Sequence, residues 1–116
     1  MEKLTALSCT RPKKGETLTN EEIYDFHTQI PAWKIVEPDG IPSLQRVFRF
    51  TNFAEALTFT NRVGELAEAE DHHPAILTEW GRVTVTFWTH VTRGLHRNDF
   101  IAAAKTDLLY ESAEKS

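Results

Sequence analysis

Three of the five histidines stand at positions where they could carry out acid–base chemistry. His72 and His73 are adjacent and are followed directly by Pro74, and His90 lies further along the chain. Histidine is the one side chain whose unperturbed pKa lets it change charge close to neutral pH, so a cluster of histidines is the first place to look for general acids and bases. We therefore take His72, His73 and His90 as the candidate catalytic residues.

A carboxylate, Asp99, could support these histidines. It falls in the predicted first turn of a helix, where the helix dipole favours a negative charge, and it could also orient an imidazole. Simpler interpretations stay open on sequence pattern alone. A His-His pair before a proline is also typical of a solvated loop, and an acid in a first helical turn commonly only stabilises the end of the helix.

The same residues can be considered as zinc ligands. His72, His73, His90 and Asp99 would supply four donor groups. However, adjacent histidines in an extended backbone point in opposite directions, and the chain has neither a pair of cysteines nor the His-x-x-x-His spacing that would hold a metal. We therefore expect no metal at this site.

The elements that must position these residues begin with a helix near Leu18. Thr19 and Glu22 have the spacing of a capping box, and Pro31 ends the segment. Apolar residues recur between them at the helical period, with His27 on or beside the same stripe. A histidine in such a place is more often a packing residue than a ligand, so we assign it no chemical role.

Two more helices follow from the same signals. Asn52 and Glu55 repeat the capping-box spacing, and one apolar face then continues to about residue 69. A third amphipathic segment covers about residues 98 to 110. Both apolar stripes are expected to pack in the core.

Four strands complete the pattern. Residues 33–37 and 44–50 are separated by a turn-forming run, and residues 76–80 and 83–90 surround Gly81-Arg82, a Gly-X pair suited to a type II′ hairpin turn. Each pair of strands is therefore expected to form a hairpin.

The predicted order is helix, two strands, helix, two strands, helix. Hairpins require antiparallel pairing, so the economical architecture is an α+β fold: a four-stranded antiparallel sheet with three helices on one face (α-β-β-α-β-β-α). The second hairpin would return the chain to the edge that holds Pro74 and so bring His90 close to His72 and His73. The uncovered face of the sheet is a candidate surface for self-association.

Composition sets the broad class. The 116 residues suffice for one hydrophobic core, and we expect a flexible N-terminal arm over residues 1–17 and a single domain over residues 18–116. The formal charge of -4 argues against nucleic-acid binding. Cys9 is the single cysteine, and no stretch approaches the roughly 20 apolar residues that span a bilayer. We expect a cytoplasmic protein that does not bind membranes.

A family resemblance extends this interpretation. The chain carries, in this order, Glu68-Ala-Glu-Asp-His72-His73-Pro74, Trp80, Thr89-His90, Gly94-Leu95 and Asp99-Phe100. In order and spacing these residues resemble the signature of the pterin-4a-carbinolamine dehydratase family. The resemblance covers nearly all of residues 19 to 110, and that family's fold, a four-stranded antiparallel sheet flanked by three helices, agrees with the predicted order.

The resemblance implies roles for the site residues. The histidines that match His72, His73 and His90 line the pterin pocket and share binding and proton transfer, while the acid that matches Asp99 supports the site and Glu68 is a further supporting residue. The implied activity is removal of water from 4a-hydroxytetrahydropterin to give quinonoid dihydropterin, with no cofactor and no metal.

The resemblance also implies partners. They are the pterin substrate, further copies of the chain in a dimer or a tetramer, and an aromatic amino acid hydroxylase whose tetrahydropterin the enzyme would regenerate. The alternative is a non-catalytic binding module, because animal members also act as dimerisation partners of a transcription factor. The retained histidines favour catalysis.

Two positions depart from the family pattern. Many relatives carry Ser or Thr, which are good helix N-caps, where this chain has His96, and some carry Cys in place of Thr92. His96 could act as a substitute cap, as a solvent-exposed residue or as an extra pocket group.

Overall fold

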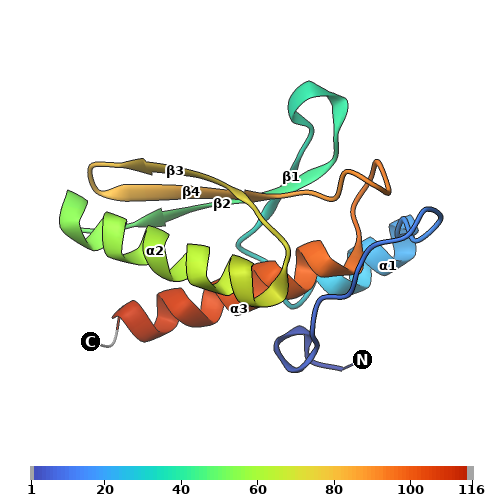
Figure 1. Ribbon diagram of the computed structural model, residues 1–116, viewed down its shortest axis with the longest axis horizontal. Helices are drawn as coiled ribbons and strands as arrows, with labels where there is room; N and C mark the ends of the chain where they lie inside the picture. The colour runs from blue at the N-terminus through green and yellow to red at the C-terminus, as the bar shows by residue number, and fades with distance from the viewer. Residues whose placement is uncertain (1, 115–116) are drawn as a thin grey trace.

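The computed structural model describes residues 2–114 and confirms the predicted order of elements. The first residue of the predicted arm and the last two of the predicted domain lie outside this range. Two short 3-10 helices, η1 and η2, accompany the three helices and four strands (Figure 1). In chain order the elements are η1 (Leu4–Ala6), α1 (Asn20–His27), β1 (Lys34–Val36), η2 (Pro38–Gly40), β2 (Ser43–Arg49), α2 (Phe53–Glu70), β3 (Ala75–Glu79), β4 (Arg82–Phe87) and α3 (Arg97–Glu114).

The helices begin where the capping signals predicted. Thr19 and Glu22 form a complete capping box, in which each side chain bonds the other residue's backbone N–H. The amide oxygen of Asn52 accepts a hydrogen bond from the backbone N–H of Glu55 at 2.8 Å. A cap of this kind is worth about 1 kcal/mol, which is enough to fix the end of a helix.

The four strands form one antiparallel sheet in the order β1-β2-β4-β3. The central strand β4 directs Val83, Val85 and Phe87 to the helical side, and all three are almost fully buried. In Figure 1, α2 and α3 run beneath this face and α1 lies on the same side, beside the start of α3. The helices therefore cover one face of the sheet, as the order of elements predicted.

The second hairpin turn differs from the predicted type. Its central residues are Trp80 and Gly81, because Glu79 already pairs with Arg82. Gly81 has a φ of 76° and thus stands second in the turn, as in a type II turn, whereas a type II′ turn needs the glycine first. The backbone N–H of Phe50 donates a hydrogen bond to the Gly81 carbonyl oxygen at 2.8 Å, so the turn also binds the residue that follows β2.

Strand β4 is shorter than predicted, which corrects the placement of His90. The strand ends at Phe87, whereas the alternation of side chains predicted a strand to His90. Phe87 pairs with Leu44, the second residue of β2, and Ala75, the first residue of β3, already pairs with Thr86, so both neighbouring strands come to an end near Phe87. His90 lies instead in the turn that follows.

Part of the N-terminal segment, residues 1–17, for which a flexible arm is predicted, contributes to the core. Leu4 is fully buried, and Leu7 and Cys9 pack against the core. The backbone N–H of Leu4 donates to Oε1 of Gln29 at 2.8 Å. The sequence could not show this packing, because a single leucine on a short 3-10 turn has no hydrophobic period.

Within residues 2–114, no helix is both long and apolar enough to cross a membrane.

Candidate active site

The C-terminal end of α2 turns the chain so that His72 enters the protein. Asp71, directly after the helix, adopts the left-handed conformation with φ 52° and ψ 42°. The backbone N–H of His72 then returns to the carbonyl oxygen of Ala67 at 3.1 Å. The helix end therefore holds the backbone of His72 firmly, and the His72 side chain is 8% exposed.

His72 contacts Asp99 at the beginning of α3. The Nε2 atom of His72 lies 2.7 Å from Oδ1 of Asp99, which is fully buried. An ionised carboxylate can only accept hydrogen bonds, so Nε2 of His72 carries the proton and donates it. The ring of Phe87 stacks against the imidazole at 11° between the planes and 6.0 Å between the ring centres. The predicted pairing of an imidazole with Asp99 thus exists in the fold.

Two further donors complete the environment of Asp99. Oδ2 accepts one hydrogen bond from the hydroxyl of Thr89 and another from the backbone N–H of His96, each at 2.9 Å. A buried carboxylate is costly unless it is hydrogen-bonded, and these bonds satisfy both of its oxygens. Sequence reasoning assigned no role to Thr89. The available signal was its position as the polar residue that continues the buried alternation Val83, Val85, Phe87.

His73 and Glu68 form a second, exposed pair. Nε2 of His73 hydrogen-bonds to Oε2 of Glu68, and the two side chains are 55% and 77% exposed. His72 and His73 therefore face different partners, as expected for neighbours in an extended backbone. This arrangement suits one histidine held inside the protein and one available at its surface.

His90 is exposed and belongs to neither of these hydrogen-bonded pairs. Its backbone carbonyl accepts a hydrogen bond from the N–H of Arg93 at 3.1 Å. No side-chain hydrogen bond joins it to His72 or His73 within the part of the chain that the structure describes. It is, however, the chain neighbour of Thr89, which binds Asp99. The structure thus brings Asp99 to His72 and Glu68 to His73, and connects His90 to the first of these pairs through its chain neighbour Thr89.

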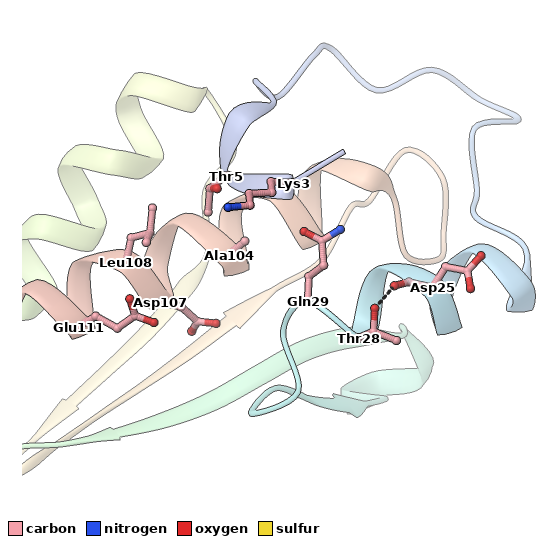
Figure 2. A pocket seen from close by; sticks show the side chains of 9 residues that line it. All are labelled: Lys3, Thr5, Asp25, Thr28, Gln29, Ala104, Asp107, Leu108 and Glu111. Atoms are coloured by element: carbon pink, nitrogen blue, oxygen red, sulfur yellow. Dashed lines mark hydrogen bonds between the residues drawn. The ribbon is translucent and has the colours of Figure 1, made fainter. Parts of the chain in front are cut away.

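Two surface hollows lie away from these pairs. One of about 770 Å³ is lined by residues of η1, α1 and α3 and by residues next to these elements, among them Gln29 and Asp107 (Figure 2). A second, of about 520 Å³, lies between the start of α2 and Tyr110. Neither contains a histidine, so we assign the site from the bonded histidines and acids, which have groups able to move a proton. Among residues 2–114, no cluster of histidine, cysteine or acidic side chains could hold a metal ion.

Comparison with known proteins points to one family. The family model described as Pterin 4 alpha carbinolamine dehydratase matches residues 16–109. A protein of Syntrophotalea carbinolica is 59% identical over 96% of this chain and its own full length, and one of Nitrosococcus oceani is 56% identical over 94% of this chain and 97% of its own. The names of both assign them provisionally to pterin-4-alpha-carbinolamine dehydratase.

Solved structures agree. A crystal structure from Brucella melitensis, described as a transcriptional coactivator/pterin dehydratase, has a TM-score of 0.73 and 31% identity, and the match covers 81% of this chain and 98% of that one. A pterin dehydratase-like RuBisCO assembly factor of the alpha-carboxysome shares the fold alone, at 24% identity and a TM-score of 0.58. Since the family model covers most of the chain and the relatives are similar over nearly their whole length, this chain belongs to the pterin-4a-carbinolamine dehydratase family.

Proposed function

We propose that this protein removes water from 4a-hydroxytetrahydropterin to give quinonoid dihydropterin, by histidine acid–base catalysis. The observation that carries the proposal is the buried pair of His72 and Asp99, a proton-carrying group held in one orientation, in a chain of this family. A binding module that had lost the activity would not have to keep a proton-carrying histidine on this carboxylate, which could stabilise the helix end without it.

The dehydration requires only proton transfers from the protein. The bond between C4a and the hydroxyl oxygen breaks, the oxygen takes a proton and leaves as water, and the ring nitrogen N5 gives up its proton. No electrons are gained or lost overall, so a general acid at the oxygen and a general base at the nitrogen are sufficient. This chemistry needs neither a metal nor a redox cofactor.

The surroundings of His72 suit it to the role of base. In the neutral ring, Nε2 carries the proton of the hydrogen bond to Asp99 and the lone pair lies on Nδ1, and no hydrogen bond joins Nδ1 to another described residue. A proton taken up at Nδ1 would create an imidazolium that the Asp99 carboxylate stabilises. His73 and His90 are exposed, so either can meet the pterin and supply the proton for the leaving oxygen. Glu68 would orient His73.

The decisive experiment follows the dehydration of chemically generated 4a-hydroxytetrahydropterin by ultraviolet absorbance. We expect His73→Ala and His90→Ala to lower turnover by about a hundred- to ten-thousandfold, as is typical when a positioned acid or base is lost. Both residues are exposed, so the free energy of unfolding should change by only about half a kcal/mol.

His27→Ala is the matched control. Nε2 of His27 donates to the carbonyl oxygen of Trp33 at 2.7 Å, far from the proposed chemistry along the chain. We expect this variant to dehydrate the pterin at the wild-type rate and to lose about 1 kcal/mol of stability with its hydrogen bond. Wild-type rates in both His73→Ala and His90→Ala would refute the catalytic assignment and favour a binding module.

We further propose that the protein forms a dimer or a tetramer, works in the cytoplasm and serves an aromatic amino acid hydroxylase. The exposed apolar side chains on the outer sheet face, Val47 and Leu77, support self-association. The link to a hydroxylase follows from the reaction, because its substrate is the hydroxylated pterin that such an enzyme releases. Adding the protein to a pterin-dependent hydroxylase with a pterin reductase should speed the return of tetrahydropterin.

A further inference from the structure

His96 occupies the N-cap position of α3 with its side chain turned inward. The residue is 3% exposed, and Nδ1 of its ring accepts a hydrogen bond from the backbone N–H of Asn98 at 3.0 Å. In return, the carboxylate of Asp99 accepts from the backbone N–H of His96. These two bonds resemble a capping box, with an imidazole in place of the usual hydroxyl and an aspartate in place of the usual glutamate, but the imidazole accepts from the second N–H of the helix instead of the third.

The other side of the same ring reaches the N-terminal segment. Because Nδ1 accepts a hydrogen bond, the proton of the neutral ring lies on Nε2, which donates to Oε1 of Glu16 at 3.2 Å. The backbone N–H of Lys13 donates to that oxygen too, and these two bonds hold the pKa of the Glu16 carboxyl below its ordinary value. A serine or threonine hydroxyl could cap α3 but is too short to bridge to Glu16 as well.

Neighbouring contacts fix the two segments to each other. The hydroxyl of Thr17 donates to the carbonyl oxygen of Thr92 at 2.7 Å, and the N–H of Leu18 donates to the carbonyl oxygen of Leu95 at 3.0 Å. The loop that ends in His96 is therefore held from outside by residues 16–18. Both ring nitrogens of His96 are engaged within the protein, so the ring is a cap and not a pocket group.

We propose that His96 is a positioning residue of the dehydratase site. One carboxylate, that of Asp99, both closes the cap of α3 and holds the ring of His72. The ring of His96 holds the backbone of the cap, and the backbone N–H of His96 binds Asp99, so a replaced ring would change the orientation of His72 through the backbone, although the buried His96 ring does not itself meet the substrate. The inference rests on the proposed function for its effect on turnover, but the orientation of His72 can be measured without any activity.

The test uses three variants of the full chain. His96→Ala removes both the cap and the tether to Glu16, His96→Ser keeps a cap but removes the tether, and Glu16→Ala removes the tether alone. Glu37→Ala, at an exposed loop glutamate, is the matched control for Glu16→Ala. For each protein we would measure kcat and KM for dehydration, and record the ring Nε2–H signal of His72 by NMR in protein labelled with 15N-histidine.

We expect His96→Ala to lower kcat by about ten- to a hundredfold, since small misplacements of catalytic groups have effects of this size, and to shift or broaden the His72 signal. In His96→Ser, kcat and the position of the His72 signal should both be close to those of the wild type. The loss of kcat that remains in His96→Ser should equal the loss in Glu16→Ala. Combining these two substitutions should not increase the loss, because both remove the same contact. Glu37→Ala should resemble wild type.

The result that overturns the proposal is an unmoved His72 signal and wild-type kcat in His96→Ala, even if its melting temperature falls. If His96→Ala does not fold, wild-type kcat and an unmoved signal in both His96→Ser and Glu16→Ala overturn it equally. Failure of the proposed function looks different: His73→Ala and His90→Ala would then keep the wild-type rate, while the His72 signal could still respond to His96.

Discussion

Asp99 is fully buried and accepts hydrogen bonds from three donors that come from different parts of the chain. His72 follows α2, Thr89 follows β4, and the backbone N–H of His96 precedes α3. These hydrogen bonds to the carboxylate are possible only because the three segments meet at Asp99. An isolated change at Asp99 should therefore affect both the chemistry and the stability of the protein.

Asp99→Asn tests this dependence on charge. An amide has one oxygen and one NH2 group, so its NH2 must face either the donor on His72 or the donors from Thr89 and His96. We expect kcat to fall about a hundredfold or more, as for other lost partners of a catalytic imidazole, and stability to fall by about 1–3 kcal/mol. Kinetics and thermal unfolding of Asp99→Asn, with Asp25→Asn as the surface control, check both effects. Wild-type kcat in Asp99→Asn would contradict the proposed role.

Cys9 offers a second residue-scale prediction. Burial, together with the negative charge of Glu70 beside it, raises the pKa of the Cys9 thiol to about 12. The thiolate is the reactive form, so the native protein at mildly alkaline pH should react with iodoacetamide much more slowly than the protein unfolded in denaturant. Mass spectrometry over time measures this. Equal rates in the folded and unfolded protein would show that the thiol is not held as described.

At the scale of elements, Asp107 fastens α3 to the sheet. Its Oδ1 atom accepts one hydrogen bond from Nε1 of Trp33 at 2.8 Å and another from Nη1 of Arg46 at 2.7 Å. Burial raises the pKa of the Asp107 carboxyl above its ordinary value, and the hydrogen bond from Trp33 and the charge of Arg46 oppose this only in part. The folded state thus favours the protonated form of Asp107 more than the unfolded state does.

This raised pKa gives stability a definite pH dependence. Its contribution is fully present below the unfolded value of 3.8 and is lost as pH rises through the higher folded pKa. Asp107→Asn cannot ionise, so we expect its melting temperature to rise relative to wild type as pH increases through a window that begins near 3.8. Thermal unfolding from below this pH to neutrality measures the difference, and Asp25→Asn serves as the control. A difference that stays constant or moves in the opposite direction would contradict the prediction.

At the scale of the whole molecule, the helices cover only one face of the sheet. On the other face, Val47 pairs with Thr84 and Thr84 with Leu77, so the three side chains form a row across the sheet. Val47 is 42% exposed and Leu77 57% exposed. Exposed apolar side chains in adjacent strands are characteristic of a surface that binds another protein.

We expect light scattering to give a mass of at least two chains, each of 13.3 kDa. Substituting both Val47→Lys and Leu77→Lys should lower this mass, because two charges would have to be buried in the interface. Tyr24→Lys, at an exposed apolar residue of α1, should leave it unchanged. A 13.3 kDa species of the wild type at working concentrations would contradict self-association.

Sequence by itself determined the elements and their order, because these depend on signals within a few residues. The capping residues Thr19 and Asn52 placed two helix ends, and alternating side chains with turn residues gave two hairpins. The ends of some elements, however, depend on residues far away in the sequence. Strand β4 stops at Phe87, close to the ends of both neighbouring strands, and no pattern around residues 83–90 could reveal where those strands end.

The candidate residues His72, His73, His90, Asp99 and Glu68 were also chosen from sequence, but only the tertiary structure decided how they are arranged. His72 meets Asp99 across 27 residues, and Thr89 and His96 join them from another loop. Leu4 reaches the core and Glu16 reaches the cap of α3 in the same way. A local pattern states which chemistry a side chain can perform, whereas its partners depend on how separate elements pack, and packing is a property of the whole chain.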